Sequence, residues 1–353
     1  MIILNKNLIF VLCLILVISI YGCKGKKDVT KALEEIRTGT DGIVISFLPN
    51  TLPEKIHVEH GIDNPPFDVI LELKNKGAYP QPDDVDPRAE FGSIGMLYLS
   101  GFDNKIIEFE TTTIDLSDKA LEGKSTINPN GGFDVASFKG RVIAENLNVE
   151  KYEPILLATI CYNYHTIAGP PVCIDPNPYS TIKEKKVCEV KDITLSNQGA
   201  PIAVTKIKEE AYATKTQFRI TIKNIGGGDS IRVKQSSEFF EKCDPFGSKK
   251  VERDDIDKVY LQEVKISDNF LQCGPYTEDP VNGIQGYVRL VNGEGSVICE
   301  FQKSDYGKAA TAYTTPIKIK LSYGYRTVAE RKMRIIKETT AAISDTPPYT
   351  ELP

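Results

Sequence analysis

Six cysteines are the residues of this sequence whose chemistry can be stated most directly. They lie beyond residue 160 of a 353-residue chain that has eight cysteines in all. In an exported protein, an even number of cysteines is typical of a disulfide framework. Zinc sites built from cysteines use closely spaced Cys-x2–4-Cys pairs, whereas no two of these six are closer than 12 residues. We therefore expect disulfides among Cys161, Cys173, Cys188, Cys243, Cys273 and Cys299.

One disulfide pairing follows from a predicted hairpin. The segment TIAGPP reads as a turn, and a hairpin centred on Ile167 places Cys161 and Cys173 opposite each other. Residues opposite one another in an antiparallel ladder have Cβ atoms about 5 Å apart, close to disulfide geometry. We expect a Cys161–Cys173 bond on the outer face of a sheet. The sequence leaves the pairing open for the other four cysteines, Cys188, Cys243, Cys273 and Cys299.

The three histidines do not form a catalytic pattern. His57 and His60 have a His-x-x-His spacing, but Pro53 and Gly61 bracket them and the sequence offers no third metal ligand nearby. His165 lies at the end of the predicted hairpin, without a neighbouring serine or cysteine nucleophile and acid. We therefore expect no enzymatic activity and no cofactor.

Two acidic segments invite a metal-site interpretation. Asp83, Asp84 and Asp86 share the proline-rich loop PQPDDVDPR, and hard cations such as Ca2+ take oxygen ligands. Three carboxylates are too few to specify a calcium cage, so a solvated loop is favoured and calcium stays the alternative. In VERDDIDK, Val251–Lys258, the alternating charges favour an ordinary solvated surface.

The N-terminal segment predicts where the protein works. Residues 8–21 are apolar apart from Ser19, Lys6 precedes them, and Cys23 is followed by three lysines within four residues. This order is typical of a secretory signal peptide, and Ile20–Cys23 resembles the lipobox of prokaryotic lipoproteins. The resemblance implies lipidation of Cys23, with membrane lipid as its partner. An uncleaved membrane anchor and free secretion are the alternatives, and all three export the remaining chain.

The elements that must position these residues are mainly strands. The net charge of −5 gives no indication of nucleic-acid binding. A chain with 16 tyrosines and no tryptophan fits β-rich packing. The segment FDVILELKNKG alternates apolar residues from Phe67 to Leu73 with mostly polar ones, which is the pattern of a half-buried strand. Asn75 and Gly77 close it with a turn.

A second copy of this pattern follows about 150 residues later. QFRITIKNIGGG places Asn224 and Gly226 where the first copy has Asn75 and Gly77. A further pair of segments, YEPILLATICYNYHT and YTTPIKIKLSYGYRT, matches when the two Tyr-x-Tyr sequences are aligned. Because both matches occur in the same order, we expect two tandem Ig-like antiparallel β-sandwiches after the N-terminal hydrophobic segment and a short helix.

The K-N-x-G turns carry a resemblance to known repeats. Each strand with its turn resembles the Ig-like repeats of prokaryotic surface proteins, notably the CARDB (cell-adhesion-related) type. The order of landmarks such as IRTGTDGIVISFLPN, ATICYNY and VRLVNGEG also resembles uncharacterised membrane-anchored proteins of archaeal genomes. The resemblance implies a β-sandwich fold at the cell surface and assigns no activity to any residue.

These observations give a predicted organisation and function. We expect a signal peptide or anchor over 1–22, a short helix or tether over 23–40, sandwiches over 41–182 and 183–338, and a flexible tail over 339–353. The second sandwich carries a loop insertion at Phe239–Pro280. The predicted function is a membrane-tethered extracellular structural, adhesion or surface-assembly protein with protein partners at the cell surface. The alternative is a lipoprotein that binds a ligand or an ion such as Ca2+ through inter-domain loops.

Overall fold

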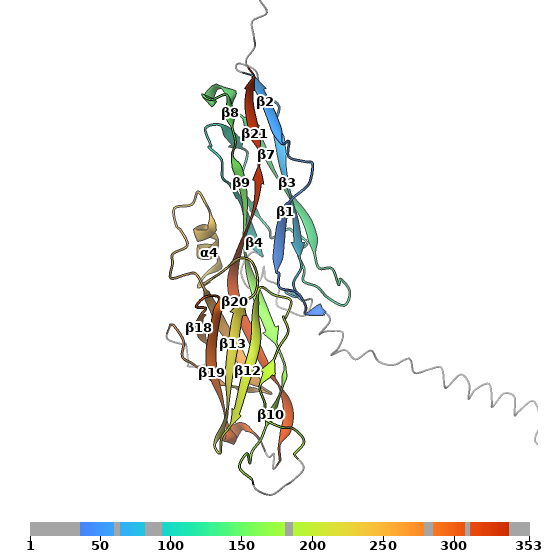
Figure 1. Ribbon diagram of the computed structural model, residues 1–353, viewed down its shortest axis with the longest axis vertical. Helices are drawn as coiled ribbons and strands as arrows, with labels where there is room; N and C mark the ends of the chain where they lie inside the picture. Colours follow the sequence, from blue (N-terminus) through green and yellow to red (C-terminus); the bar gives the residue numbers. More distant parts are fainter. Residues whose placement is uncertain are drawn as a thin grey trace, which may run out of the picture.

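The computed structural model describes residues 36–59, 64–81, 94–180, 186–278, 285–307 and 311–338. Within these ranges the chain forms mainly antiparallel sheets, which confirms the predicted all-β sandwich class. The molecule is long and narrow, with two lobes stacked end to end (Figure 1). We call the upper lobe in Figure 1, which contains β1, β3 and β7, lobe 1, and the lower lobe, which contains β12, β13 and β19, lobe 2. The predicted leader, the predicted tail and most of the predicted helix at residues 23–40 lie outside the described residues.

Lobe 1 has an outer sheet of four strands. Its order is β1-β3-β7-β5. In β3, Phe67, Val69, Leu71 and Leu73 are buried, as the alternating pattern predicts, because successive side chains of a strand point to opposite faces. The strands are β1 (Ile43–Phe47), β3 (Phe67–Asn75), β7 (Phe133–Val142) and β5 (Ile107–Phe109).

Lobe 2 repeats this sheet with one additional edge strand. Its order is β11-β12-β13-β19-β17. The register repeats as well, since Ile43 pairs with Asn75 in lobe 1 and Ile202 pairs with Asn224 in lobe 2. The strands are β11 (Ile193–Thr194), β12 (Ile202–Ala211), β13 (Lys215–Asn224), β19 (Glu294–Gln302) and β17 (Gln272–Gly274).

One continuous sheet runs behind both lobes. Its main path is β16-β15-β20-β9-β4-β6, and β10, β14 and β18 pair at its sides. A single hydrophobic core extends through both lobes between this shared sheet and the two outer sheets. The strands are β16 (Asn269–Phe270), β15 (Lys258–Ile266), β20 (Tyr313–Lys332), β9 (Ile155–Ala168), β4 (Gly95–Ser100), β6 (Thr113–Asp115), β10 (Pro171–Ile174), β14 (Asp229–Ile231) and β18 (Gly286–Arg289).

The far end of lobe 1 carries a small third sheet. Its strand order is β2-β21-β8, and β2 runs parallel to β21. The strands are β2 (Lys55–Glu59), β21 (Arg334–Glu338) and β8 (Lys151–Tyr152). Two 3-10 turns, η1 (Ala144–Asn146) and η3 (Lys303–Asp305), and one helix, α4 (Ser236–Cys243), complete the described elements.

The predicted hairpin at TIAGPP does not form. Strands β9 and β10 both pair with β20 in one register, with Ala168 opposite Ile319 and Pro171 opposite Pro316. The chain therefore continues straight through Gly169-Pro170 as one long strand. Pro170 has no amide hydrogen to donate, but its carbonyl accepts a hydrogen bond from the Ile317 amide at 3.0 Å. The hydrogen-bonded ladder therefore continues past this proline.

The two sequence repeats are joined by exchange of their last strands. The end of β9 and all of β10 lie beside the lobe 2 half of β20, whereas the end of β20 lies beside the lobe 1 half of β9. Strand β21 then completes the third sheet of lobe 1. Figure 1 shows β20 and β21 running in red from one lobe into the other. The predicted boundary between residues 182 and 183 lies outside the described residues, and each lobe contains strands from both repeats.

The two Tyr-x-Tyr sequences meet at the centre of the molecule, which we call the waist. Tyr162 pairs with Tyr325 and Tyr164 with Tyr323 across the antiparallel ladder. Their rings are at most 2% exposed and pack with centroids 5.6–6.3 Å apart. Asn163 pairs with Gly324, its equivalent in the other repeat, and each flanking tyrosine pairs with the equivalent of the other, so an approximate two-fold axis passes through this tyrosine cluster.

Candidate functional site

The repeated Asn and Gly residues build equivalent turns on the two sides of the waist. Asn75 Oδ1 accepts hydrogen bonds from Tyr164 Oη at 3.2 Å and from the Gly77 amide at 3.0 Å. Asn224 Oδ1 accepts the equivalent bonds from Tyr325 Oη at 3.1 Å and from the Gly226 amide at 3.2 Å.

A glycine is required at both turns. A Cβ on Gly77 would overlap the Tyr164 hydroxyl, and one on Gly226 would overlap the Tyr325 hydroxyl. The K-N-x-G repeat is therefore structural: it locks each outer sheet to the tyrosine cluster.

The first described residues lie against the waist. The Gly39 amide donates to Asn197 Oδ1 at 3.1 Å, and the Ala78 amide donates to the Gly199 carbonyl at 2.7 Å. Asn197 and Gly199 precede β12 of lobe 2, whereas Gly39 precedes β1 of lobe 1. The N-terminal end of the described body is thus held between the lobes, far from either tip (Figure 1).

Three disulfides are present among the described residues, and the predicted Cys161–Cys173 pairing is wrong. Cys161 is bonded to Cys243, and Cys173 to Cys188. Because β9 and β10 form one extended strand, Cys161 and Cys173, which are 12 positions apart, are separated by about 40 Å. Cys161 does lie on the face away from the tyrosines, as predicted, but the residue that reaches it comes from α4.

The third disulfide has the cross-strand geometry that was expected elsewhere. Cys273 and Cys299 lie directly opposite each other in β17 and β19, with Cα atoms 4.0 Å apart. The expectation that six cysteines form a disulfide framework is therefore met by a different set of pairs. The shared sheet gains a covalent link to α4, and lobe 2 gains two further links.

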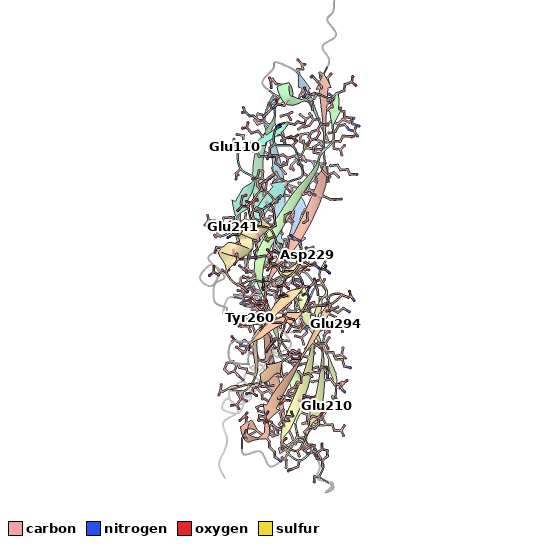
Figure 2. All side chains as sticks on the ribbon, turned by 90° about the vertical axis from the view of Figure 1, so that its left-hand side faces the viewer. Glu110, Glu210, Asp229, Glu241, Tyr260 and Glu294 are labelled. Atoms are coloured by element: carbon pink, nitrogen blue, oxygen red, sulfur yellow. A yellow bond between two sulfur atoms is a disulfide. The ribbon has the colours of Figure 1, made fainter. Side chains whose placement is uncertain are left out.

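Helix α4 covers the outer face of the shared sheet at the waist. Figure 2 shows this helix, marked by Glu241, at mid-height on the side of the molecule. Phe239 and Phe240 are buried in a second, smaller hydrophobic cluster with Tyr98 and Cys161. Tyr98 Oη donates to the Phe240 carbonyl at 2.6 Å. The predicted loop insertion therefore begins with a helix that is docked and covalently fixed.

A buried charge network lies beneath α4, where the sequence predicted an ordinary surface. Asp255 is 1% exposed and Lys258 is 3% exposed. Asp255 Oδ1 accepts a hydrogen bond from Arg232 Nη2 at 2.7 Å, and its Oδ2 accepts one from Lys242 Nζ at 3.0 Å. Burial alone would raise the pKa of Asp255, but the bonds from Lys242 and Arg232 lower it below its ordinary value.

A second acid completes this network. Glu278 Oε1 accepts hydrogen bonds from Lys258 Nζ at 2.9 Å and Arg232 Nη1 at 2.5 Å. Burial raises the pKa of Glu278, and the two cations outweigh this and bring it to about 2. The carboxylates of Asp255 and Glu278 are thus both paired with cations, so this network stabilises the insertion and offers no free group for chemistry.

The two described histidines, His57 and His165, lie apart from each other. His57 is on β2, half-exposed, and contacts the Glu338 carboxylate. His165 is 2% exposed and packs on the Tyr79 ring with centroids 4.5 Å apart. Burial, aided by the charge of Lys320, lowers the pKa of His165 to about 3, so it is neutral at physiological pH. His60 lies outside the described residues.

Other predicted site residues fall in segments that the structure does not describe. These are Cys23, Asp83, Asp84 and Asp86. In the described ranges, no group of three or more His, Cys, Asp or Glu side chains is placed to hold a metal ion. Lipidation and calcium binding therefore stay predictions.

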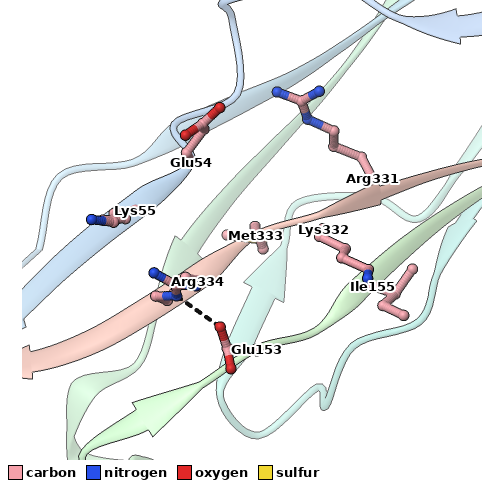
Figure 3. A pocket seen from close by; sticks show the side chains of 8 residues that line it. All are labelled: Glu54, Lys55, Glu153, Ile155, Arg331, Lys332, Met333 and Arg334. Carbon is pink, nitrogen blue, oxygen red and sulfur yellow. Dashed lines mark hydrogen bonds and ion pairs between the residues drawn. The ribbon is translucent and has the colours of Figure 1, made fainter.

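A cavity of about 630 Å3 lies at the lobe 1 tip, where β20 ends and β21 begins. Figure 3 shows four cationic and two acidic side chains around it. The buried Met333 marks the point where the chain passes from the shared sheet to the third sheet, and its amide donates to the Pro154 carbonyl. The lining residues are Glu54, Lys55, Glu153, Ile155, Arg331, Lys332, Met333 and Arg334.

The charges of this lobe 1 tip cavity are only partly matched. Arg334 Nε donates to Glu153 Oε1 at 2.7 Å (Figure 3). Lys55, Arg331 and Lys332 form no ion pair within the described part of the chain. The cavity therefore presents an excess of positive charge that can bind carboxylate, sulfate or phosphate groups.

Sequence reasoning missed this cavity. Its one local signal is the cationic run Arg331–Arg334, because Lys55 and Glu153 come from distant parts of the chain. Their approach depends on β21 pairing with both β2 and β8, which no local pattern indicates.

Comparisons with known proteins add no family. No protein-family model matches the chain, and the search of curated proteins finds no similar sequence. Among the described residues, no helix is both long and apolar enough to cross a membrane. The resemblance to CARDB-type repeats thus remains an expectation from sequence.

Proposed function

We propose that this protein is a membrane-tethered extracellular scaffold, without catalytic activity, that acts in adhesion or in a surface assembly. The proposal rests on two observations: the three disulfides, and the contact between the waist and the N-terminal end of the described residues at Gly39. Disulfides persist in oxidising, extracytoplasmic compartments. A tether that joins the body between the lobes leaves both tips free to meet partners.

The strand exchange suits a load-bearing role. Pulling the lobes apart requires the separation of β9 and β20, which pair over 14 residues from Ile155 to Ala168. The continuous core behind this pair resists the same separation. A chain of two independent sandwiches joined by a linker would bend at the linker, whereas this body transmits force along one sheet.

The lobe 1 tip cavity is the surface that we assign to a partner. Its unmatched cations, Lys55, Arg331 and Lys332, favour an acidic group on that partner. Loops and strand ends at the tip of a rigid sandwich are common binding positions.

Cross-linking in intact cells followed by mass spectrometry tests this function. We expect surface partners to be captured by the wild-type protein, and capture to fall at least fivefold in Arg331→Glu. Arg219→Glu is the matched control, because Arg219 is an exposed arginine of β13 without an ion pair in the described residues. Equal capture by both variants would contradict the assignment of the tip. Recovery of the native protein in the cytosol would contradict the scaffold itself.

A further inference from the structure

A second cavity, of about 540 Å3, lies in lobe 2 beside the Cys173–Cys188 disulfide. It is formed by β10, by β12, by Thr314 of β20 and by residues 186–193. Figure 1 places β10 in the lower part of lobe 2, and Figure 2 shows Glu210, the neighbour of the residue discussed next, toward the same end. This cavity is far from the lobe 1 tip and is independent of the function proposed above.

A buried carboxyl group lines this cavity. Glu209 follows Ile207 on the core-facing side of β12 and is 5% exposed. Its Oε2 accepts one hydrogen bond, from the Cys173 amide at 3.3 Å. Its Oε1 is buried and has no hydrogen-bond partner among the described residues. A carboxyl oxygen without a donor is costly to bury, so this site is incomplete within the described residues.

Among the described residues, the cationic side chains that line the cavity do not neutralise Glu209. Lys186 is directed to Asp175, with Nζ 2.5 Å from Oδ2, and it also donates to the Asn177 carbonyl. Lys191 is exposed to solvent, and Glu189 adds a negative charge at the cavity wall. Tyr306 also lies close enough to interact electrostatically with Glu209.

The protonation of Glu209 reflects this environment. Burial raises the pKa of Glu209 to about 7, and the Cys173 amide offsets the rise only in part. At pH 6 the carboxyl is therefore mostly protonated in the free protein. A cation delivered to Oε1 favours the carboxylate, so binding and proton release are linked.

Apart from Glu209, Lys186, Glu189, Lys191 and Thr314, the residues that line the cavity are apolar or belong to the disulfide. Pro171, Val172 and Ile193 contribute hydrocarbon, and the Cys173–Cys188 bridge contributes sulfur. Val187, also in the lining, is 78% exposed and offers further hydrocarbon where the cavity meets solvent. The volume lies in the range of small-molecule sites.

We propose that this cavity binds a primary ammonium group on a short aliphatic chain, with Glu209 as the counter-ion. A neutral donor such as a hydroxyl would satisfy Oε1 without favouring the ionised carboxylate, whereas an ammonium supplies both a hydrogen bond and a compensating charge. The apolar walls cover the aliphatic part. A free alkylamine and the lysine side chain of a partner protein share this chemistry. When the free carboxylic acid binds the ammonium, its proton leaves to solvent and an ion pair remains.

Isothermal titration calorimetry of the purified body with its disulfides intact tests the proposal at pH 6. The probes are n-butylammonium, the neutral analogue 1-butanol, and Nα-acetyl-lysine amide, whose tighter binding would indicate a lysine side chain as the natural ligand. Titrations in two buffers with different ionisation enthalpies measure the proton release. We expect n-butylammonium to bind at least tenfold more tightly than 1-butanol, with release of close to one proton.

Two matched variants make the result specific. Glu209→Gln keeps the size of the side chain and should abolish both the preference for the ammonium and the proton release. Glu330→Gln makes the same change at an exposed position of β20 outside this cavity and should leave both unchanged. Absence of n-butylammonium binding, equal binding of 1-butanol, or unchanged binding by Glu209→Gln would each overturn the proposal.

Discussion

The equivalent asparagines of the two repeats allow one prediction to be worked out in detail. Asn75 is fully buried, and its side chain makes four hydrogen bonds, two of them from Nδ2 to the carbonyls of Tyr79 and Leu121 at 2.8 and 2.9 Å. Asn224 is only partly buried and makes three, with Nδ2 donating to the Gly228 carbonyl at 2.9 Å. Replacement by alanine removes all of these bonds but leaves unpaired buried groups mainly around Asn75.

The magnitudes follow from the number and burial of the lost bonds. At about 1 kcal/mol per net hydrogen bond, Asn75→Ala should lower the free energy of unfolding by about 4 kcal/mol. Asn224→Ala should lower it by about 1–2 kcal/mol, because water can reach part of this site and replace the lost partner. The two substitutions are otherwise the same change at equivalent positions of the fold.

Urea unfolding followed by far-UV circular dichroism measures both values. The continuous core predicts one cooperative transition for the wild type and for both variants. Asn104→Ala serves as a control at an exposed position and should change the free energy by less than about 0.5 kcal/mol. Equal losses for Asn75→Ala and Asn224→Ala, or a larger loss for the second, would refute the reasoning from burial.

Three further predictions concern the waist and the helix docked on it. The low pKa of His165 means that the unfolded chain binds a proton between pH 6.5 and about 3 that the folded protein excludes, so stability falls on acidification. From pH 7 to pH 4 the wild type should lose about 3 kcal/mol more than His165→Phe in urea titrations, and parallel losses would contradict this. The double variant Cys161→Ala and Cys243→Ala opens a bridge across 82 residues and should lower the unfolding free energy by about 4 kcal/mol, whereas an unchanged value would show that the bridge does not constrain the unfolded chain. Gly324→Ala places a Cβ 2.6 Å from the Phe239 ring and should accelerate hydrogen exchange in α4 while lowering the unfolding free energy by about 2 kcal/mol, and unchanged exchange would argue against that contact.

The all-β class and the internal repeat could be predicted because their signals are local. The alternation in β3 depends only on the two-residue period of a strand, and the Asn and Gly residues of each turn are close together in sequence. The tyrosine alignment identified two segments that lie in β9 and β20, but no sequence pattern gave reason to expect that these strands pair with each other.

The disulfides show where local reasoning fails. Gly169 and Pro170 are typical turn residues, yet pairing with β20 keeps the chain extended through them. This non-local pairing moved Cys173 away from Cys161 and left room for Cys243 of the insertion.

The sequence also gave no indication that single charged residues would be buried. Glu209 lies on the core face because a bulge between Val204 and Lys206 shifts the alternation of β12 by one residue. Simple alternation from Ile202 would place Glu209 outside. Asp255 is buried because Arg232 and Lys242 approach it from distant positions, and such partners cannot be read from VERDDIDK.

Peptide mapping of the protein isolated from intact cells, with thiols blocked before lysis, tests the central claim most directly. The account predicts membrane-associated protein whose non-reduced digest contains three linked pairs, Cys161–Cys243, Cys173–Cys188 and Cys273–Cys299. Blocked free thiols at these six positions, or a Cys161–Cys173 peptide, would contradict it.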